Sequence, residues 1–154
     1  MLGLDPGSRV TGWGLIEGSA RRIVATEFGC IHPVRGPSRA AILGSLQDQL
    51  ALLLERLAPD VVAVETPFAG RHPQAALALA EARGAILSAL GRWGGEVVEY
   101  APARVKAAVV GNGRAEKQQV AFVIRHALQL EVVPAADAAD ALAVALCHLR
   151  STLS

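Results

Sequence analysis

The stretch from Val61 to Glu65, VVAVE, constrains the fold more than any other part of the chain. Its four consecutive apolar residues leave this short run without a polar face. A strand of this kind is covered on both sides, as the central strands of α/β sheets are. Helical patterns flank it, because leucines recur at helical spacing over residues 42–57 and an alanine-rich helix is expected over residues 74–93. The chain is therefore predicted to be an α/β protein.

The remaining segments predict a mixed five-stranded sheet flanked by helices. Further strands are expected at 2–5, 11–18, 21–31 and 96–100, and short turns between the first three predict antiparallel pairing. Pro37-Ser38 is expected to open the first helix, and three more helices are expected at 102–110, after the loop 111–113, and from near Pro134. With 154 residues, 52% of them apolar, the chain can bury one sizeable core. We expect a single domain, residues 1–154.

Four carboxylates stand at positions where ligands are often held. Asp5 and Glu65 end buried strands, and open α/β sheets bind ligands at the carboxyl ends of their strands. Asp137 and Asp140 lie three residues apart at the start of the last helix, and so on one face of it. Carboxylate oxygens suit hard divalent cations such as Mg²⁺ or Mn²⁺. If the four side chains converge, we expect two such ions, which together can drive hydrolysis of a phosphodiester.

Each carboxylate also has an ordinary structural explanation. Asp5-Pro6-Gly7 is strong turn chemistry, and Glu65 could be a solvated strand end. Asp137 could be a helix N-cap and Asp140 an acid of the first turn. Taken one at a time the residues decide nothing, and it is their combination that favours a metal site.

Charge and cysteine content narrow the choice of partner and compartment only slightly. The formal net charge of +1 does not by itself indicate a nucleic-acid partner. A near-zero net charge still allows a positively charged face, if acidic residues elsewhere offset it. No apolar run is long enough to span a membrane, and we expect no membrane partner and a cytoplasmic protein. Cys30 and Cys147 are expected to be buried thiols of a reducing compartment, and a zinc site is not expected from their spacing.

Four ordered motifs resemble the RuvC-type Holliday-junction resolvases of bacteria, which have a ribonuclease H-like fold. The resemblance covers essentially the whole chain. Its motifs are LDPGSRVTGWG from Leu4, VAVETPFAGRHPQAALALAEARG from Val62, YAPARVKAAVVGNGRAEKQQV from Tyr100, and ADAADALAVALCH from Ala136. By position, the resemblance assigns Asp5, Glu65, Asp137 and Asp140 as catalytic, metal-binding carboxylates.

The resemblance also implies partners and a mode of action. It implies a homodimer that nicks two opposed strands of four-way junction DNA symmetrically, with Mg²⁺ or Mn²⁺ as cofactor. The helix over residues 74–93 would lie at the dimer interface, although core packing explains its two apolar faces equally well. Branch-migration motor proteins of the same pathway are further expected partners.

Basic and aromatic residues complete the candidate site by the same resemblance. Lys106 and Lys117 match family positions near the scissile phosphate, and Lys117 is also assigned a catalytic role. Phe68 matches an aromatic residue that stacks on unpaired bases at the crossover, and such stacking is worth about 1–3 kcal/mol per base. Weaker DNA-binding candidates are Arg9, Arg71, Arg104 and Arg114. Two alternatives remain open. Lys117 could be a solvated surface lysine, and Phe68 could be a loop residue that covers the edge of the core.

Other functions fit the sequence less well. Nucleases that process ribosomal RNA precursors share the fold but lack this pairing of the first motif with the terminal acidic motif. Actin-like ATPases need two large domains, which 154 residues cannot supply. A module that binds junctions without cutting them remains a distinct alternative, and the presence of all four acids argues against it.

Overall fold

The computed structural model describes residues 1–19, 22–34, 36–66 and 72–152. Five strands and five helices follow one another in the order predicted from the sequence. They are β1 (Leu2–Asp5), β2 (Thr11–Ser19), β3 (Arg22–Ile31), α1 (Arg39–Leu57), β4 (Val61–Glu65), α2 (Pro73–Trp93), β5 (Glu96–Tyr100), α3 (Pro102–Val110), α4 (Lys117–Ala127) and α5 (Ala136–Thr152). The last helix begins two residues beyond Pro134, where the sequence had placed its start, because Pro134 and Ala135 belong to the preceding loop.

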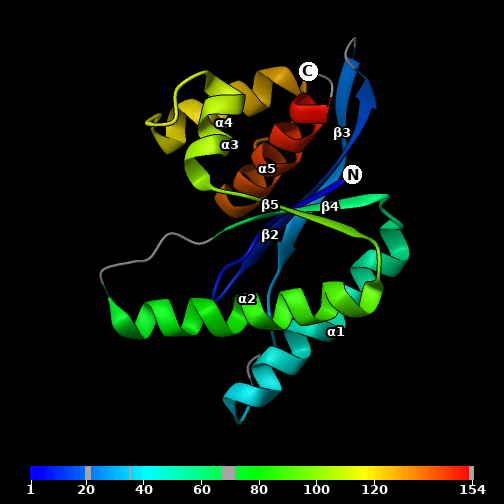
Figure 1. Cartoon of the computed structure of the whole chain (residues 1–154), viewed down its shortest axis with the longest axis vertical. Coiled ribbons are helices and arrows are strands. Elements are labelled where there is room, and N and C mark those ends of the chain that lie inside the picture. The colour runs from blue at the N-terminus through cyan, green and yellow to red at the C-terminus, as the bar shows by residue number, and fades with distance from the viewer. Residues whose placement is uncertain (20–21, 35, 67–71, 153–154) are drawn as a thin grey trace.

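The strands form one mixed sheet in the order β3-β2-β1-β4-β5 (Figure 1). β1 pairs with β2, and β2 with β3, in antiparallel fashion, whereas β4 runs parallel to both β1 and β5. The predicted antiparallel pairing of the first three strands is confirmed. The run VVAVE lies inside this sheet, between β1 and β5, which accounts for its lack of a polar face.

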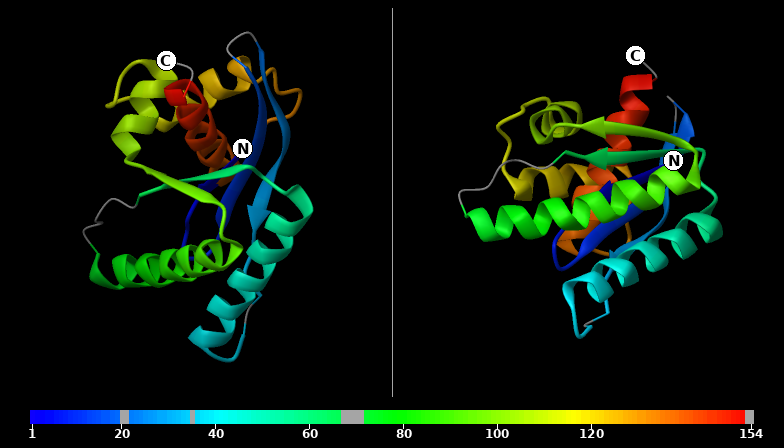
Figure 2. Two further views of the ribbon diagram at one scale, coloured as in Figure 1. Left: turned by 45° about the vertical axis from the view of Figure 1, so that its right-hand side comes forward. Right: turned by 60° about the horizontal axis from the view of Figure 1, so that its bottom comes forward.

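Helices cover the two faces of the sheet unequally. α1 and α2 lie against one face, and α5 lies against the other with α3 and α4 packed beside it (Figure 2). The helix opens at Pro37-Ser38, as predicted, and the Ser38 hydroxyl accepts a hydrogen bond from the Ala41 amide and caps α1. None of the described helices is long and apolar enough to cross a membrane.

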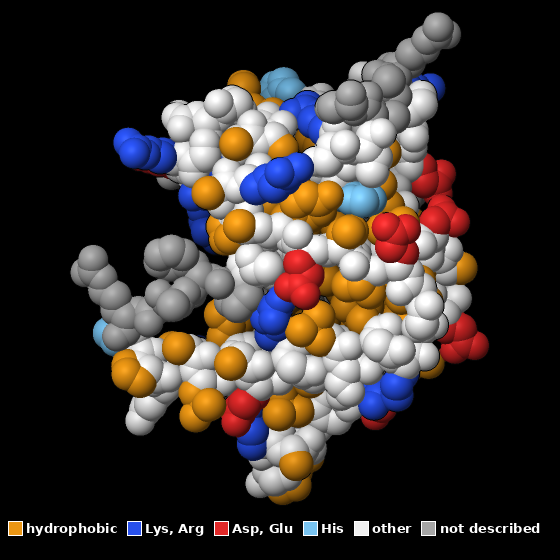
Figure 3. Space-filling model, in the orientation of Figure 1, with side chains coloured by type: hydrophobic (Ala, Val, Ile, Leu, Met, Phe, Trp, Pro, Cys, Tyr) orange, Lys and Arg blue, Asp and Glu red, His pale blue; other side chains and the backbone are white. Residues whose placement is uncertain are grey.

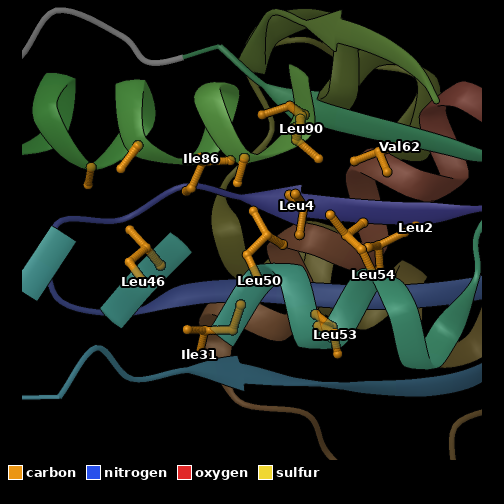
Figure 4. Close-up of a cluster of buried hydrophobic side chains, with 14 of the residues drawn as sticks. Leu2, Leu4, Ile31, Leu46, Leu50, Leu53, Leu54, Val62, Ile86 and Leu90 are labelled. Carbon is orange, nitrogen blue, oxygen red and sulfur yellow. The ribbon is translucent and has the colours of Figure 1, made fainter. Parts of the chain in front are cut away.

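The α1–α2 side holds a core of large aliphatic side chains (Figure 4). Leu2 and Leu4 of β1 and Val62 and Val64 of β4 point into it and are fully buried. Residues alternate between the faces of a strand, so the next positions along β1 and β4 point the other way, toward α5. Those positions include Asp5 and Glu65.

The second core, between the sheet and α5, is built with smaller side chains. Gly3 and Gly12 lie so close to α5 that a methyl group on either would meet a backbone oxygen of the helix, Ala141 O or Asp137 O, at about 2 Å. The helix is therefore seated directly on the strands, and its first turn is held over the end of β1. Both cysteines are free thiols. Cys147 is buried as expected, whereas Cys30 is only partly buried, which differs from the prediction.

Candidate active site

Two carboxylates are brought side by side by the register of β1 and β4. Gly3 is opposite Ala63 and Leu4 is opposite Val64, so the next residues of the two parallel strands are Asp5 and Glu65. Both are on the α5 face and both are partly buried. Their side chains are close enough for the charge of Glu65 to raise the pKa of Asp5. Two acids that lie sixty positions apart in the sequence are thus adjacent at the carboxyl ends of β1 and β4.

The last helix adds a third carboxylate to the same cavity. Asp140, in the first turns of α5, lines a cavity of about 170 Å³ together with Asp5 and Glu65. The full lining is Asp5, Glu65, Pro102, Val105, Lys106, Lys117, Val120, Asp140 and Ala143. Asp137 does not line the cavity, but its charge is close enough to raise the pKa of Asp5.

Two lysines face these acids across the cavity. The Lys117 ammonium donates a hydrogen bond to Asp140 Oδ2 at 2.7 Å, and its side chain is 78% exposed. Lys117 is the first residue of α4, and at this helix start the Glu116 amide donates to Gln119 Oε1 at 2.9 Å. Lys106 lines the cavity from α3. The cavity therefore presents cations as well as anions to a ligand.

Burial and mutual repulsion perturb the acids strongly. Burial, followed by the charges of Glu65 and Asp140, raises the pKa of Asp5 from 3.8 to about 7. The pKa of Glu65 is raised by burial first and by Asp140 second. The pKa of Lys117 is raised, mainly by its hydrogen bond to Asp140. The cluster holds more negative charge than its own residues neutralise, and a bound cation would relieve this repulsion.

The chemistry of these donors fits a hard divalent cation. Asp5, Glu65 and Asp140 offer carboxylate oxygens around one small cavity, as Mg²⁺ and Mn²⁺ require. Within the ranges that the structure describes, no three His, Cys, Asp or Glu side chains are grouped tightly enough to hold an ion in their present positions. Asp140 is turned to the Lys117 ammonium. Coordination would need these side chains to reorient.

Comparison with known proteins identifies the family. The family model described as "Crossover junction endodeoxyribonuclease RuvC" matches residues 1–148. The RuvC proteins of Halorhodospira halophila and Alkalilimnicola ehrlichii are each 47% identical to this chain, over 96% and 97% of it and over 88% and 90% of their own lengths. The chain belongs to the RuvC family of crossover junction endodeoxyribonucleases.

Solved structures agree with this assignment. The Thermus thermophilus RuvC in complex with a Holliday junction substrate has a TM-score of 0.90 and 31% identity, covering 99% of this chain and 93% of that one. The yeast mitochondrial resolvase Ydc2 has a TM-score of 0.71 at 14% identity, covering 97% of this chain and 78% of that one, and shows the shared fold alone. The predicted resemblance to RuvC and the predicted ribonuclease H-like α/β fold are confirmed.

Among the other DNA-binding candidates of this RuvC family member, Arg9, Arg104 and Arg114 do not line the carboxylate cavity. Phe68 and Arg71 fall outside the described residues. Arg104 is exposed on α3, with its guanidinium 5.7 Å from the centre of the Tyr100 ring, and Arg114 is exposed in the loop before α4. Arg9 is exposed in the turn between β1 and β2. Their contacts with DNA remain predictions.

Three features that support the site were not predicted from the sequence. The Tyr100 hydroxyl and His148 Nδ1 are 2.8 Å apart, and this contact joins β5 to α5. The carbonyl of Tyr100 accepts from the Thr66 amide at 2.8 Å, which extends the pairing of β4 just beyond Glu65. The close packing of α5 on Gly12 is the third feature. Its only sequence signal is the set of small residues on alternate strand positions, and that signal does not identify the partner helix.

Proposed function

We propose that this chain resolves four-way DNA junctions as a divalent-metal-dependent endonuclease, hydrolysing phosphodiester bonds in two opposed strands. The observation that supports this most directly is the cavity lined by Asp5, Glu65 and Asp140 in a member of the RuvC family. Its pathway is homologous recombination and DNA repair. We expect a single nuclease domain acting in the cytoplasm.

The carboxylates would hold the ions in this proposal. Asp5, Glu65 and Asp140 line the cavity and would bind the ions, and Asp137 would join them from the neighbouring turn of α5. Two ions, Mg²⁺ or Mn²⁺, would supply an activated water and stabilise the leaving oxygen of the phosphodiester. Partial burial of Asp5 and Glu65 keeps bulk water from screening their charges, which strengthens their hold on a cation.

The two lysines are proposed to bind the phosphate. The Lys117 ammonium is already within hydrogen-bonding distance of Asp140, and its exposure leaves it free to contact a strand that enters the cavity. Lys106 lines the cavity from α3 and adds a second positive charge. In Figure 3 the part of the surface over α3 and α4 carries Lys and Arg side chains, whereas most Asp and Glu side chains in view lie toward the other edge. DNA would approach the cavity from this positive side.

Two copies of the chain would act together. Leu77 on α2 is 63% exposed, although the same helix buries Ile86 and Leu90 in the core. An apolar side chain left uncovered on a long helix is consistent with a homodimer interface along α2, and a two-fold dimer matches the approximate symmetry of a four-way junction. Phe68 is proposed to stack on bases at the crossover. Branch-migration motor proteins complete the proposed set of partners.

The decisive experiment measures binding and nicking of a synthetic four-way junction in Mg²⁺, in Mn²⁺ and in chelator. We expect Asp5→Asn to bind the junction as the wild type does but to nick it about 10³-fold more slowly, because phosphate contacts supply binding while cutting needs the carboxylate. Asp48→Asn, on the exposed surface of α1, is the matched control and should leave both quantities unchanged.

Several outcomes would count against the proposal. Full nicking by Asp5→Asn, or by the wild type in chelator, would remove the carboxylates from the chemistry. A wild type that binds junctions tightly but cuts none in either metal would be a junction-binding module instead.

A further inference from the structure

Tyr100 joins two walls of the carboxylate cavity. It is the last residue of β5 and lies opposite Glu65, the last residue of β4, in the parallel pairing of these strands. α3 begins two residues after Tyr100, at Pro102, and both Pro102 and Lys106 of this helix line the cavity. The position of Tyr100 therefore affects the strand end that carries a carboxylate and the helix that faces it.

The main chain of Tyr100 is bound to the strand that carries Glu65. The Tyr100 carbonyl accepts a hydrogen bond from the Thr66 amide at 2.8 Å and another from the Thr66 hydroxyl at 3.2 Å. Thr66 follows Glu65 directly in the chain. These two hydrogen bonds therefore hold the backbone beside the Glu65 carboxylate.

The side chain of Tyr100 reaches α5, which is the helix that brings Asp140 to the cavity. Its hydroxyl lies 2.8 Å from Nδ1 of His148, and His148 is only 6% exposed. His148 lies about two helical turns from Asp140 on α5. Tyr100 thus bonds to the strand of Glu65 through its carbonyl and to the helix of Asp140 through its hydroxyl.

The ring of Tyr100 is also covered from α3. The Arg104 guanidinium lies 5.7 Å from the centre of the ring. Arg104 Nη2 donates in turn to the Ser151 hydroxyl of α5 at 3.5 Å. These contacts do not involve the Tyr100 hydroxyl, so replacing tyrosine by phenylalanine removes the hydrogen bond to α5 and leaves the ring in its place.

We propose that Tyr100 is a positioning residue for metal binding, and that its hydrogen bond to His148 sets the separation of Glu65 and Asp140. Carboxylates bind an ion together only when they are held at distances that suit it. Groups that orient metal ligands from behind change metal affinity about tenfold or more when they are removed. The inference rests on the proposed nuclease function, because it takes these carboxylates as the ligands of the ions.

The test measures Mn²⁺ binding to the metal-free protein without DNA, by electron paramagnetic resonance of the free ion. We expect Tyr100→Phe to bind Mn²⁺ about tenfold more weakly than the wild type does. His148→Leu removes the same hydrogen bond from the side of α5 and should weaken binding by a similar factor. His148→Asn is the matched variant, because its amide can take the place of Nδ1 and bond to the Tyr100 hydroxyl. It should keep most of the affinity.

A core variant separates positioning from a general loss of stability. Leu50 packs on the opposite face of the sheet, so Leu50→Ala should be more destabilised than Tyr100→Phe and still bind Mn²⁺ as the wild type does. Junction affinity in chelator should be the same for Tyr100→Phe and the wild type, because the phosphate contacts are unchanged.

Three results would overturn the inference. They are equal Mn²⁺ affinities of Tyr100→Phe and the wild type, equal losses in Tyr100→Phe and Leu50→Ala, and a loss in His148→Asn as large as that in His148→Leu. A wild type that neither binds Mn²⁺ nor nicks a junction in its presence would remove the proposed function as well. That outcome is distinct from failure of the inference alone, in which the wild type binds the ion and nicks.

Discussion

The two faces of the sheet are built on different packing rules. The face toward α1 and α2 is filled by large aliphatic side chains such as Leu50, Leu54 and Ile86. The face toward α5 uses glycine on the strands and alanine on the helix, so backbone approaches backbone. Asp5 and Glu65 point to this second face. One face supplies stability by burial, and the other gives up side-chain volume to hold charged groups close together.

The largest expected effect comes from adding one methyl group on the α5 face. Gly12→Ala would place its Cβ 1.9 Å from the Asp137 carbonyl oxygen, so the start of α5 must move. We expect a loss of about 4 kcal/mol in the free energy of unfolding and reduced nicking by the folded fraction. Gly44→Ala on α1 has nothing within 4 Å of the new methyl group and should stabilise by about 0.5–1 kcal/mol. Urea unfolding measures the free energy of unfolding of both variants. Equal changes in the two would contradict the proposed difference between the α5 face and α1.

Removing volume from the α1–α2 face should affect stability without affecting chemistry. Leu50 is fully buried there. We expect Leu50→Ala to lower the free energy of unfolding by about 3 kcal/mol. Nicking per folded molecule should stay at the wild-type rate, because the carboxylates lie on the other face. The two quantities are separated by measuring nicking at a temperature well below the unfolding midpoint, and a specific loss of nicking there would contradict the division between faces.

The charged face should also make stability depend on pH. The pKa of Asp5 is raised from 3.8 to about 7 by burial and by neighbouring acids, so the folded chain keeps a proton that the unfolded chain releases. The free energy of unfolding in chelator should therefore fall as pH rises through this window, by about 2 kcal/mol after allowing for partial exposure of the carboxyl.

Asp5→Asn isolates this contribution. The difference in unfolding free energy between the variant and the wild type should favour the variant, and should grow from mildly acidic to mildly alkaline pH. A difference that shrinks as pH rises would show that Asp5 is stabilised as the carboxylate.

The smallest expected effect concerns the hydrogen bond between Tyr100 and His148 on the α5 face. Tyr100→Phe removes the hydroxyl that lies 2.8 Å from His148 Nδ1, while the ring of His148 is almost fully buried. We expect a loss of about 1 kcal/mol, the usual net value of one hydrogen bond. Burial lowers the pKa of His148, so its imidazole is neutral in the folded protein at neutral pH. Urea unfolding at neutral pH checks this, and an unchanged midpoint would mean that α5 is held by apolar contacts alone.

Much of the architecture could be predicted because its signals are local. The alternation of strands and helices, the capping role of Ser38 and the central placement of VVAVE each follow from a few neighbouring residues. Family motifs then supplied the expected site, and the structure brings Asp5, Glu65 and Asp140 to one cavity. The sequence did not predict the close approach of Gly12 to Asp137, because that contact joins residues more than a hundred positions apart.

The sequence by itself therefore determined the order of the elements and the placement of acids at strand ends, since hydrophobic periodicity and turn chemistry act over short stretches. Only the tertiary structure decided that Asp5 and Glu65 are neighbours, because the parallel register of β1 and β4 is a relation between distant segments. It also decided that Lys117 bonds to Asp140. Packing over long sequence separations sets these distances, and they determine what the charged groups can bind.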